Sequence, residues 1–363
     1  MNEVLDRFRE VARSCEGDVF GAPRTTPVQA LARVAEQAEE LGIDQWDVYA
    51  ERGAVARLEE EVAGLLGKPA AAMFPSGIMA QQAALRVHAD RRGSLRVGIP
   101  EISHLLQHED DGPRAVHGFR FEHLSTGRDL PTVADVERLG PGLGAILLEL
   151  PLRDAGCLLP EWDDLVAITA KARELDAAVH LDGARIWESQ PFYDRPLSEI
   201  AGVGDSIYVS FYKGLGGLAG ACLAGEEDVV EEARRWRRRM GGTLFHLTPL
   251  AVSALAGLRE YLPKMGEYVA WGRSLASHLV ASGVRVHPDP PHTNTFELFA
   301  DGEPDAVNER VIAFMEETWV QPCGIWRQTP VPGVVTCEVA VHEAAMTRDP
   351  REVARWLTEI TAR

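Results

Sequence analysis

The sequence predicts an α/β protein built around a parallel β-sheet. Two short apolar runs, HLDG and SIYVSFYKG, each contain a charged residue at their end, Asp182 and Lys213, and glycine follows each of them. Such runs are typical of buried parallel strands at the point where they open into loops. Amphipathic helical patterns such as LEEEVAGLLGK lie between the apolar runs. The 363 residues are enough for a large domain plus a small one.

Composition and charge exclude several functional classes. Hydrophobic residues make up 45% of the chain, which is ordinary for a globular protein and argues against disorder. The net charge of −18 argues against nucleic acid or an anionic membrane surface as a partner. The 5 cysteines are scattered without metal-ligand spacing, so we expect no metal site and a reducing, cytoplasmic location. Neither a signal peptide nor a membrane-spanning run is evident.

Two charged groups on buried strands indicate a ligand between them. In an open α/β sheet the carboxyl ends of the strands form the ligand site. A buried carboxylate and a buried lysine are costly unless something charged separates them. We therefore predict that pyridoxal 5'-phosphate (PLP) lies here, with Lys213 holding it as a Schiff base and Asp182 pairing with its pyridine nitrogen. The alternative, a surface lysine, is disfavoured by the apolar run before Lys213 and the glycines after it.

A phosphate cradle is predicted at the start of the next helical pattern after AAAMF. Ser76, Gly77 and Ile78 stand where a buried strand passes into a helix. The N–H groups of a helix's first turn point outward, its dipole favours an anion, and Gly77 lets the backbone approach closely. Taken alone, Ser76 is more simply a helix N-cap. Its place ahead of the Asp182 and Lys213 motifs favours the phosphate interpretation.

The blocks around these residues resemble the threonine aldolase and β-eliminating lyase group of fold-type I PLP enzymes. HLDGAR and SFYKGLGGLAG carry the resemblance, and residues 47–68 and 70–85 are similar to that family's N-terminal blocks, in the same order. The resemblance implies a transferase-like fold of type I, whose large domain has a mostly parallel seven-stranded sheet flanked by helices. A smaller C-terminal α/β domain completes it. Active sites shared across a homodimer or homotetramer interface are also implied.

The same resemblance implies domain boundaries. Residues 1–45 would form an N-terminal helical segment that packs with the small domain. Residues 46–250 would form the large PLP-binding domain, and residues 251–363 the small C-terminal domain. No repeat, low-complexity tract or proline-rich linker separates the domains.

Further site residues follow from the positions that match the family. His104 would stack on the cofactor ring and assist proton transfer, and Ser210 would contact the phosphate. Arg185 would face Asp182 and bind the substrate carboxylate, with a structural salt bridge as the alternative. Tyr49 would approach the substrate, or else be a partly buried tyrosine at a domain edge.

Other positions stay open on sequence alone. His180 either orients Asp182 or is an ordinary core histidine. We expect a surface or capping role for His108, and a solvated helix end or subunit contact for the basic run at residues 234–239. His246 lies in MGGTLFHLTP, which resembles a loop that relatives place near the neighbouring subunit's cofactor.

Two departures from the family fall on substrate recognition. The family's strand ending at Glu149 normally continues into Asn, Thr and His, but here it continues as LPLRD, which leaves Arg153 as an anion contact. The final strand carries Glu338 near the place of a carboxylate-binding Arg, for which Arg327 is the substitute. The implied activity is a PLP-dependent lyase, with aldol cleavage of a β-hydroxy-α-amino acid to glycine and an aldehyde favoured. β-Elimination, transamination, and PLP binding without turnover stay open.

Overall fold

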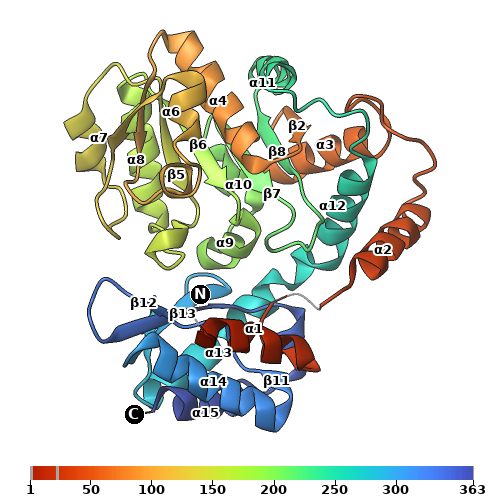
Figure 1. Cartoon of the computed structure of the whole chain (residues 1–363). Helices are drawn as coiled ribbons and strands as arrows, with labels where there is room; N and C mark the ends of the chain where they lie inside the picture. The colour runs from red at the N-terminus through yellow and green to blue at the C-terminus, as the bar shows by residue number, and fades with distance from the viewer. Residues whose placement is uncertain (1–2, 22–23, 363) are drawn as a thin grey trace. The chain divides into compact units, whose positions relative to one another are not determined.

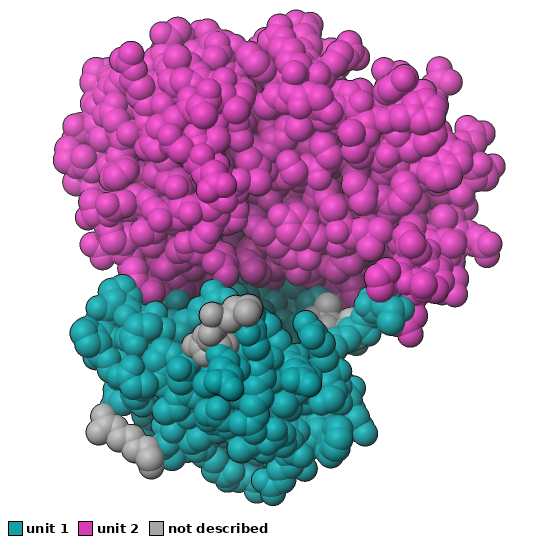
Figure 2. All heavy atoms as spheres, viewed as in Figure 1, with its two compact units in different colours: residues 1–26, 264–363 teal, residues 27–263 magenta. Residues whose placement is uncertain are grey.

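The computed structural model describes residues 3–21 and 24–362, and they form two compact units. One unit comprises residues 27–263, and the other comprises residues 1–26 together with 264–363; they are coloured separately in Figure 2. The helix α1 (Glu3–Ser14) belongs to the smaller unit, whereas α2 (Pro27–Glu40) belongs to the larger one. The domain boundaries expected at residues 46 and 251 refer to folding domains, which this division into units does not test, and they therefore stay predictions.

The larger unit is built on the predicted mostly parallel sheet, visible in the upper part of Figure 1. Its 7 strands follow the order β2-β8-β7-β6-β5-β3-β4, and only β8 runs antiparallel to its neighbours. This confirms the predicted fold class. The strands are β2 (Ala70–Phe74), β3 (Arg96–Ile99), β4 (Arg120–His123), β5 (Ala145–Glu149), β6 (Ala178–Gly183), β7 (Ser206–Ser210) and β8 (Ala221–Gly225).

Helices cover the sheet, and small side chains let them approach it closely. The helix α4 (Gly77–Arg92) packs on β6, β7 and β8, and α11 (Glu227–Arg239) packs on α4 and β2. Alanines at 80, 83, 84 and 233 form much of the buried interface there. The remaining helices are α3 (Gly53–Leu66), α5 (His104–Gln107), α6 (Gly112–His117), α7 (Val133–Leu139), α8 (Trp162–Glu174), α9 (Ile186–Tyr193), α10 (Leu197–Gly202) and α12 (Thr248–Glu260).

Capping residues fix where these helices begin and end. Gly67 ends α3 in the left-handed conformation, as its place after the helical pattern predicts. Ser76 caps α4 and its hydroxyl accepts a hydrogen bond from the Met79 N–H. The helix α8 begins at Trp162. The residues of the edge strand β4 are all exposed or half-buried, so no buried apolar run marks this strand in the sequence.

The smaller unit contains a four-stranded antiparallel sheet in the order β12-β13-β10-β9. A two-stranded parallel sheet joins β1 to β11, and α1 packs on α14. No helix in the described ranges is long and apolar enough to cross a membrane. The bounds are β1 (Gly17–Asp18), α13 (Met265–Ala281), β9 (Arg285–His287), β10 (Thr295–Asp301), α14 (Pro304–Thr318), β11 (Val320–Gln321), β12 (Arg327–Gln328), β13 (Val334–Ala340) and α15 (Pro350–Thr361).

Candidate cofactor and active site

Asp182 stands at the carboxyl end of β6, in the middle of the sheet. Its side chain is buried and accepts two hydrogen bonds, from Gln81 Nε2 at 2.8 Å and from the Ala184 N–H at 2.9 Å. Burial raises the pKa of the Asp182 carboxyl, whereas the positive charge of Lys213 and the two donors lower it. Gln81 comes from α4, so this helix positions the carboxylate as well as covering the sheet.

Lys213 lies in the loop that follows β7, the neighbouring strand. Burial lowers the pKa of its amine, while the negative charges of Asp182, Glu149 and Glu188 oppose that shift. Lys213 and Asp182 therefore lie within electrostatic range of each other, as the sequence predicts. A lowered pKa favours the neutral amine, which is the form that acts as a nucleophile.

The residue after Lys213 must be small because of a buried acid on α9. A Cβ atom at Gly214 would overlap the Glu188 carboxyl group. Glu188 is fully buried, and its carboxyl makes no side-chain hydrogen bond to any described residue; Arg185 Nη1 lies 3.7 Å from its Oε1 atom. Burial raises the pKa of Glu188, and the positive charge of Arg185 lowers it. Arg185 thus faces a carboxylate inside the site, consistent with the salt bridge that was its structural alternative.

A second buried acid stands beside Asp182. Glu149 ends β5 and pairs in register with Asp182 across the sheet. Its Oε1 atom accepts hydrogen bonds from Ser103 Oγ at 2.5 Å and from the His104 N–H at 2.6 Å. Burial, followed by repulsion from Asp182, raises the pKa of Glu149 to about 8. Two neighbouring buried carboxyls are hard to ionise together, so Glu149 holds its proton at neutral pH.

The start of α4 lies against the phenol of Tyr208 on β7. A Cβ atom at Gly77 would overlap the Tyr208 ring, so only glycine allows this approach. The Ser210 hydroxyl is fully buried and makes no hydrogen bond among the described residues, although it and Tyr212 both affect the pKa of Tyr208. Three hydroxyl groups therefore gather near one another, and the Ser210 group retains hydrogen-bonding capacity for an anion.

His104 begins the short helix α5, and its backbone is fixed by Glu149. Its Nδ1 atom lies 3.0 Å from Glu109 Oε1, and its ring centroid lies 4.8 Å from that of His108. Burial, the charge of Lys213 and the charge of His108 lower the pKa of His104 to about 4. His108 in turn contacts Asp154 Oδ2 through Nε2 at 2.8 Å, and Arg153 Nη1 donates to Asp154 Oδ1 at 2.8 Å. His108 is thus an exposed histidine that is hydrogen-bonded to Asp154.

Some candidates lie in other surroundings. Asp47 accepts hydrogen bonds from the Leu247 and Thr248 N–H groups, and this joins the DVYAE block to the start of α12. Tyr49 consequently lies beside Phe245, with 55% of its surface exposed. His246 Nδ1 contacts the Asp47 carbonyl at 2.6 Å. Arg327 belongs to the smaller unit, where it is exposed on β12.

His180 is a core histidine that contacts Ser206. Its Nδ1 atom lies 2.8 Å from Ser206 Oγ, and His88 Nε2 lies 2.8 Å from the same hydroxyl. Burial lowers the pKa of His180 to about 3 and that of His88 to about 4, so both rings are neutral. This observation favours the core alternative over a role in orienting Asp182.

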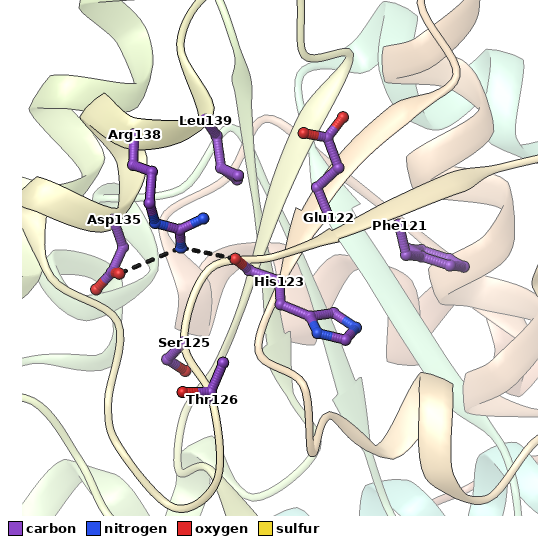
Figure 3. Close-up of a pocket in the computed structure, with 8 residues that line it drawn as sticks. All are labelled: Phe121, Glu122, His123, Ser125, Thr126, Asp135, Arg138 and Leu139. Carbon is purple, nitrogen blue, oxygen red and sulfur yellow. Dashed lines mark hydrogen bonds and ion pairs between the residues drawn. The ribbon is translucent and has the colours of Figure 1, made fainter.

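The cavity in Figure 3 lies elsewhere on the larger unit, beside the edge strand β4. It has a volume of about 510 Å³ and is lined by residues of β4 and α7. Arg138 Nη2 donates to the His123 carbonyl at 2.9 Å and lies 3.3 Å from Asp135 Oδ1. None of the sequence-predicted site residues lines it, and its guanidinium is already bound. We therefore locate the candidate site at the strand ends and not in this cavity.

Sequence reasoning missed four residues that complete the site: Gln81, Glu109, Glu188 and Tyr208. Gln81 and Glu188 are buried polar residues that directly follow apolar residues near the start of their helices, which is the signal that could have identified them. Tyr208 is two residues before Ser210 on the same strand, so alternation places both side chains on one face. Glu109 follows His104 by more than one helical turn. Because α5 ends at Gln107, the chain turns there and the Glu109 carboxyl comes to lie beside the His104 ring.

Comparison with known proteins agrees with this geometry. Residues 24–302 match the model of the beta-eliminating lyase family. The low-specificity L-threonine aldolase 1 of Arabidopsis thaliana is 29% identical over 294 residues, which cover 77% of this chain and 79% of the relative. A crystal structure of a proposed L-allo-threonine aldolase from Listeria monocytogenes EGD-E is 33% identical, with a TM-score of 0.92 and 99% of each chain covered. This chain therefore belongs to the beta-eliminating lyase family.

Proposed function

We propose that this protein is a PLP-dependent lyase that cleaves a β-hydroxy-α-amino acid to glycine and an aldehyde. The observation that carries the proposal is the half-buried Lys213 within electrostatic range of the buried Asp182, at the carboxyl-end side of adjacent strands in a family member. The relatives named as threonine aldolases support the aldol reaction over the other reactions of this cofactor.

The residues present fit the proposed cofactor. The buried Ser210 hydroxyl, which makes no hydrogen bond among the described residues, and the helix start that Gly77 brings against the Tyr208 phenol suit a phosphate at the start of α4. Ser76 and the N–H groups of Gly77 and Ile78 would be further donors. Asp182 would hold the pyridine nitrogen, and Lys213 would hold the aldehyde carbon. When bound, PLP supplies an electron sink for a negative charge at the substrate α-carbon.

The chain's own groups supply binding and proton transfer. The desolvated amine of Lys213 is available as a nucleophile and as a proton carrier. The Asp182 carboxyl is held by Gln81 and the Ala184 N–H, and in its ionised form it would stabilise a proton on the ring nitrogen of a bound cofactor. His104 is neutral at physiological pH and can accept a proton at a ring nitrogen. The Arg185 guanidinium can bind a carboxylate, which suits an amino-acid substrate.

Product analysis with purified enzyme tests the reaction. We expect glycine and acetaldehyde from threonine, and no product from Lys213→Ala. Lys171→Ala is a matched control and should retain full activity, because Lys171 forms surface ion pairs with Glu137 on α7 and with Glu174 on α8. Pyruvate and ammonia without glycine would instead select β-elimination, and absence of any product from a panel of β-hydroxy amino acids would contradict the lyase assignment.

We further propose a homodimer or homotetramer in the cytoplasm. Exposed apolar side chains support the assembly into a dimer or tetramer. We call them the aromatic patch, and they are Trp46, Val48, Tyr49, Leu244 and Phe245. Such a patch commonly marks a protein–protein contact. The free thiols of all 5 cysteines suit a reducing compartment. The substrate roles of Tyr49 and Arg327 are part of this proposal, and light scattering on wild-type protein and Phe245→Glu tests the assembly.

A further inference from the structure

A side-chain amide from α4 is hydrogen-bonded to the carboxyl group at the centre of the site. Gln81 Nε2 lies 2.8 Å from Asp182 Oδ2, and only 3% of the surface of Gln81 and 6% of that of Asp182 is exposed. The other carboxyl oxygen, Oδ1, accepts a hydrogen bond from the Ala184 N–H at 2.9 Å. Each oxygen of Asp182 therefore has one donor and keeps a lone pair for another.

The packing of α4 on the sheet explains why this amide reaches Asp182. Gly77 and Gln81 are four residues apart on α4, so they lie one turn apart on the same face of the helix. Gly77 packs against the Tyr208 ring on β7, and Tyr208 pairs in register with Asp182 on β6. The close approach at Gly77 thus brings the next turn of α4, which carries Gln81, over the end of β6.

The Gln81 amide uses only part of its hydrogen-bonding capacity. Its Oε1 atom is buried and makes no hydrogen bond to any described residue. An apolar side chain of similar length would avoid the cost of burying that oxygen. Among the described residues, the amide is hydrogen-bonded to Asp182 alone. The role of this buried amide therefore lies in its contact with Asp182.

The groups that face Asp182 act on its charge in opposite directions. Burial raises the pKa of the Asp182 carboxyl, whereas the charge of Lys213, the Ala184 N–H and the Gln81 amide lower it. The other titratable groups that interact electrostatically with Asp182 carry no positive charge; they are Glu149 on β5, Glu109 after α5 and Tyr208 on β7. A Lys213 amine that acts as a nucleophile is neutral, so in that form it no longer supports a negative Asp182. The two N–H donors remain.

We propose that Gln81 is a positioning residue that orients Asp182 and keeps it ionised for contact with the ring nitrogen of PLP. The amide fixes Oδ2 and favours the negative form, and the remaining lone pairs of the carboxylate can accept an N–H from the ring. A proton held on that nitrogen makes the ring a stronger electron sink. The part that concerns PLP rests on the proposed function, whereas the effect of Gln81 on Asp182 does not.

Carbon NMR of aspartate-labelled, cofactor-free protein tests the effect on Asp182, and Asp182→Asn identifies its carboxyl resonance. Gln81→Met removes the donor but keeps an unbranched side chain of similar length. In this variant we expect Asp182 to retain its proton to higher pH than in wild type. Gln82→Met is the matched control, because Gln82 is the next residue of α4, is also buried, and donates to neither oxygen of Asp182. It should leave the titration of Asp182 unchanged.

A second measurement needs no variant that could fail to fold. In cofactor-free wild type, the Gln81 side-chain amide signals in nitrogen NMR should shift with pH together with the Asp182 carboxyl signal, because the two groups share a hydrogen bond. Amide signals that do not follow the titration of Asp182 would contradict the contact on which the inference depends.

Binding of two ligands tests the consequence for PLP. One ligand is PLP, and the other is its analogue in which a C–H group replaces the ring nitrogen; fluorescence titration measures each Kd. We expect wild type and Gln82→Met to bind PLP more tightly than the analogue. In Gln81→Met the Kd for PLP should rise about tenfold, as for loss of a hydrogen bond to a charged group, while the Kd for the analogue should change little.

Two results would overturn the inference: a titration of Asp182 that is the same in wild type and Gln81→Met, and an equal weakening of both ligands by Gln81→Met. A different result would count against the proposed function. If wild type bound PLP and the analogue equally while Asp182 still responded to Gln81→Met, the effect of Gln81 on Asp182 would stand, and the proposed contact between Asp182 and the ring nitrogen would be wrong.

Discussion

At the scale of single residues, the site is defined by an excess of buried acids. Asp182, Glu149 and Glu188 are all buried within electrostatic range of Lys213, and burial raises the pKa of each carboxyl. An isolated buried carboxylate is costly, so such a group is neutral unless a cation or strong donors face it. Asp182 has two donors and the charge of Lys213, whereas Glu149 has two donors but is repelled by Asp182. Glu188 makes no side-chain hydrogen bond among the described residues, and the charges of Arg185 and Lys213 lower its pKa. Asp182 is therefore the acid best suited to hold charge.

The contact between Gly214 and Glu188 gives a prediction for Lys213. In Gly214→Ala the new methyl group overlaps the Glu188 carboxyl, so the lysine loop must shift. We expect a weaker visible absorption band at equal PLP and a lower melting temperature. The double variant Gly214→Ala/Glu188→Ala removes the overlap and should recover part of both losses. Gly202→Ala is the control, since an added methyl there meets nothing within 4 Å in the described residues.

A double variant that is no better than Gly214→Ala would show that the glycine is needed for another reason. Equal absorption and stability of Gly214→Ala and wild type would contradict the packing described here. The comparison needs only spectra and thermal unfolding, so it does not depend on which amino acid is the substrate.

At the scale of elements, α4 serves three purposes. Its small residues pack on the sheet, its Gln81 holds Asp182, and its first turn offers N–H groups beside the buried Ser210 hydroxyl. The first two are contacts of described atoms, and the third is the proposed anion site. Because one helix carries all three, that helix would set the distance between the proposed phosphate site and the Gln81–Asp182 contact.

Gly77→Ala tests this element. The methyl group would overlap the Tyr208 ring, so the start of α4 must move away from β7. A charge-assisted hydrogen bond is worth about 1.5–3 kcal/mol, and loss of one would weaken PLP binding by about tenfold or more. Fluorescence titration measures the Kd. Gly64→Ala in α3 is the control; it meets nothing within 4 Å among the described atoms and should leave the Kd unchanged while stabilising the helix. An unchanged Kd for Gly77→Ala would contradict the cradle.

The elements also show what the sequence could and could not predict. The strand that carries Asp182, the strand before Lys213 and the helix capped by Ser76 are visible in the sequence because apolar runs and capping residues are local signals; the strand before Lys213 ends at Ser210, and Lys213 lies in the loop after it. The edge strand β4 was missed because its pairing with β3, and not its own apolar content, makes it a strand. Gln81 and Glu109 were missed for a related reason. Their partners are distant in sequence or beyond a helix end, and only the tertiary fold brings them together.

At the scale of the whole molecule, the buried titratable groups make stability depend on pH. The pKa of Glu149 is about 8 and that of Glu109 about 7, both above the usual value of 4.5. The folded state thus retains protons that the unfolded chain has released, and the stability from these groups falls as pH rises through this window. The buried His88 and His180 act oppositely, but only between their lowered pKa values, about 4 and 3, and the usual 6.5.

Between pH 6.5 and 8 the change of stability with pH therefore comes from these acids and not from the two buried histidines. We expect the unfolding free energy of cofactor-free wild type to decline with pH more steeply than that of Glu149→Gln, by up to about 1.4 kcal/mol per pH unit. Urea unfolding at several pH values measures both slopes. Glu122→Gln is the control, because Arg96 lowers the pKa of Glu122 and this group is ionised in both states throughout the window. Equal slopes for wild type and Glu149→Gln would contradict the burial argument.

The central claim is that Lys213 is the residue that carries PLP. The most direct measurement is to incubate the purified protein with PLP, reduce it with borohydride, and locate the added mass by peptide mass spectrometry. The account predicts that the label is on Lys213 in wild type and in Lys171→Ala, and that Lys213→Ala carries none. A label on another lysine, or no label on wild type, would contradict the account.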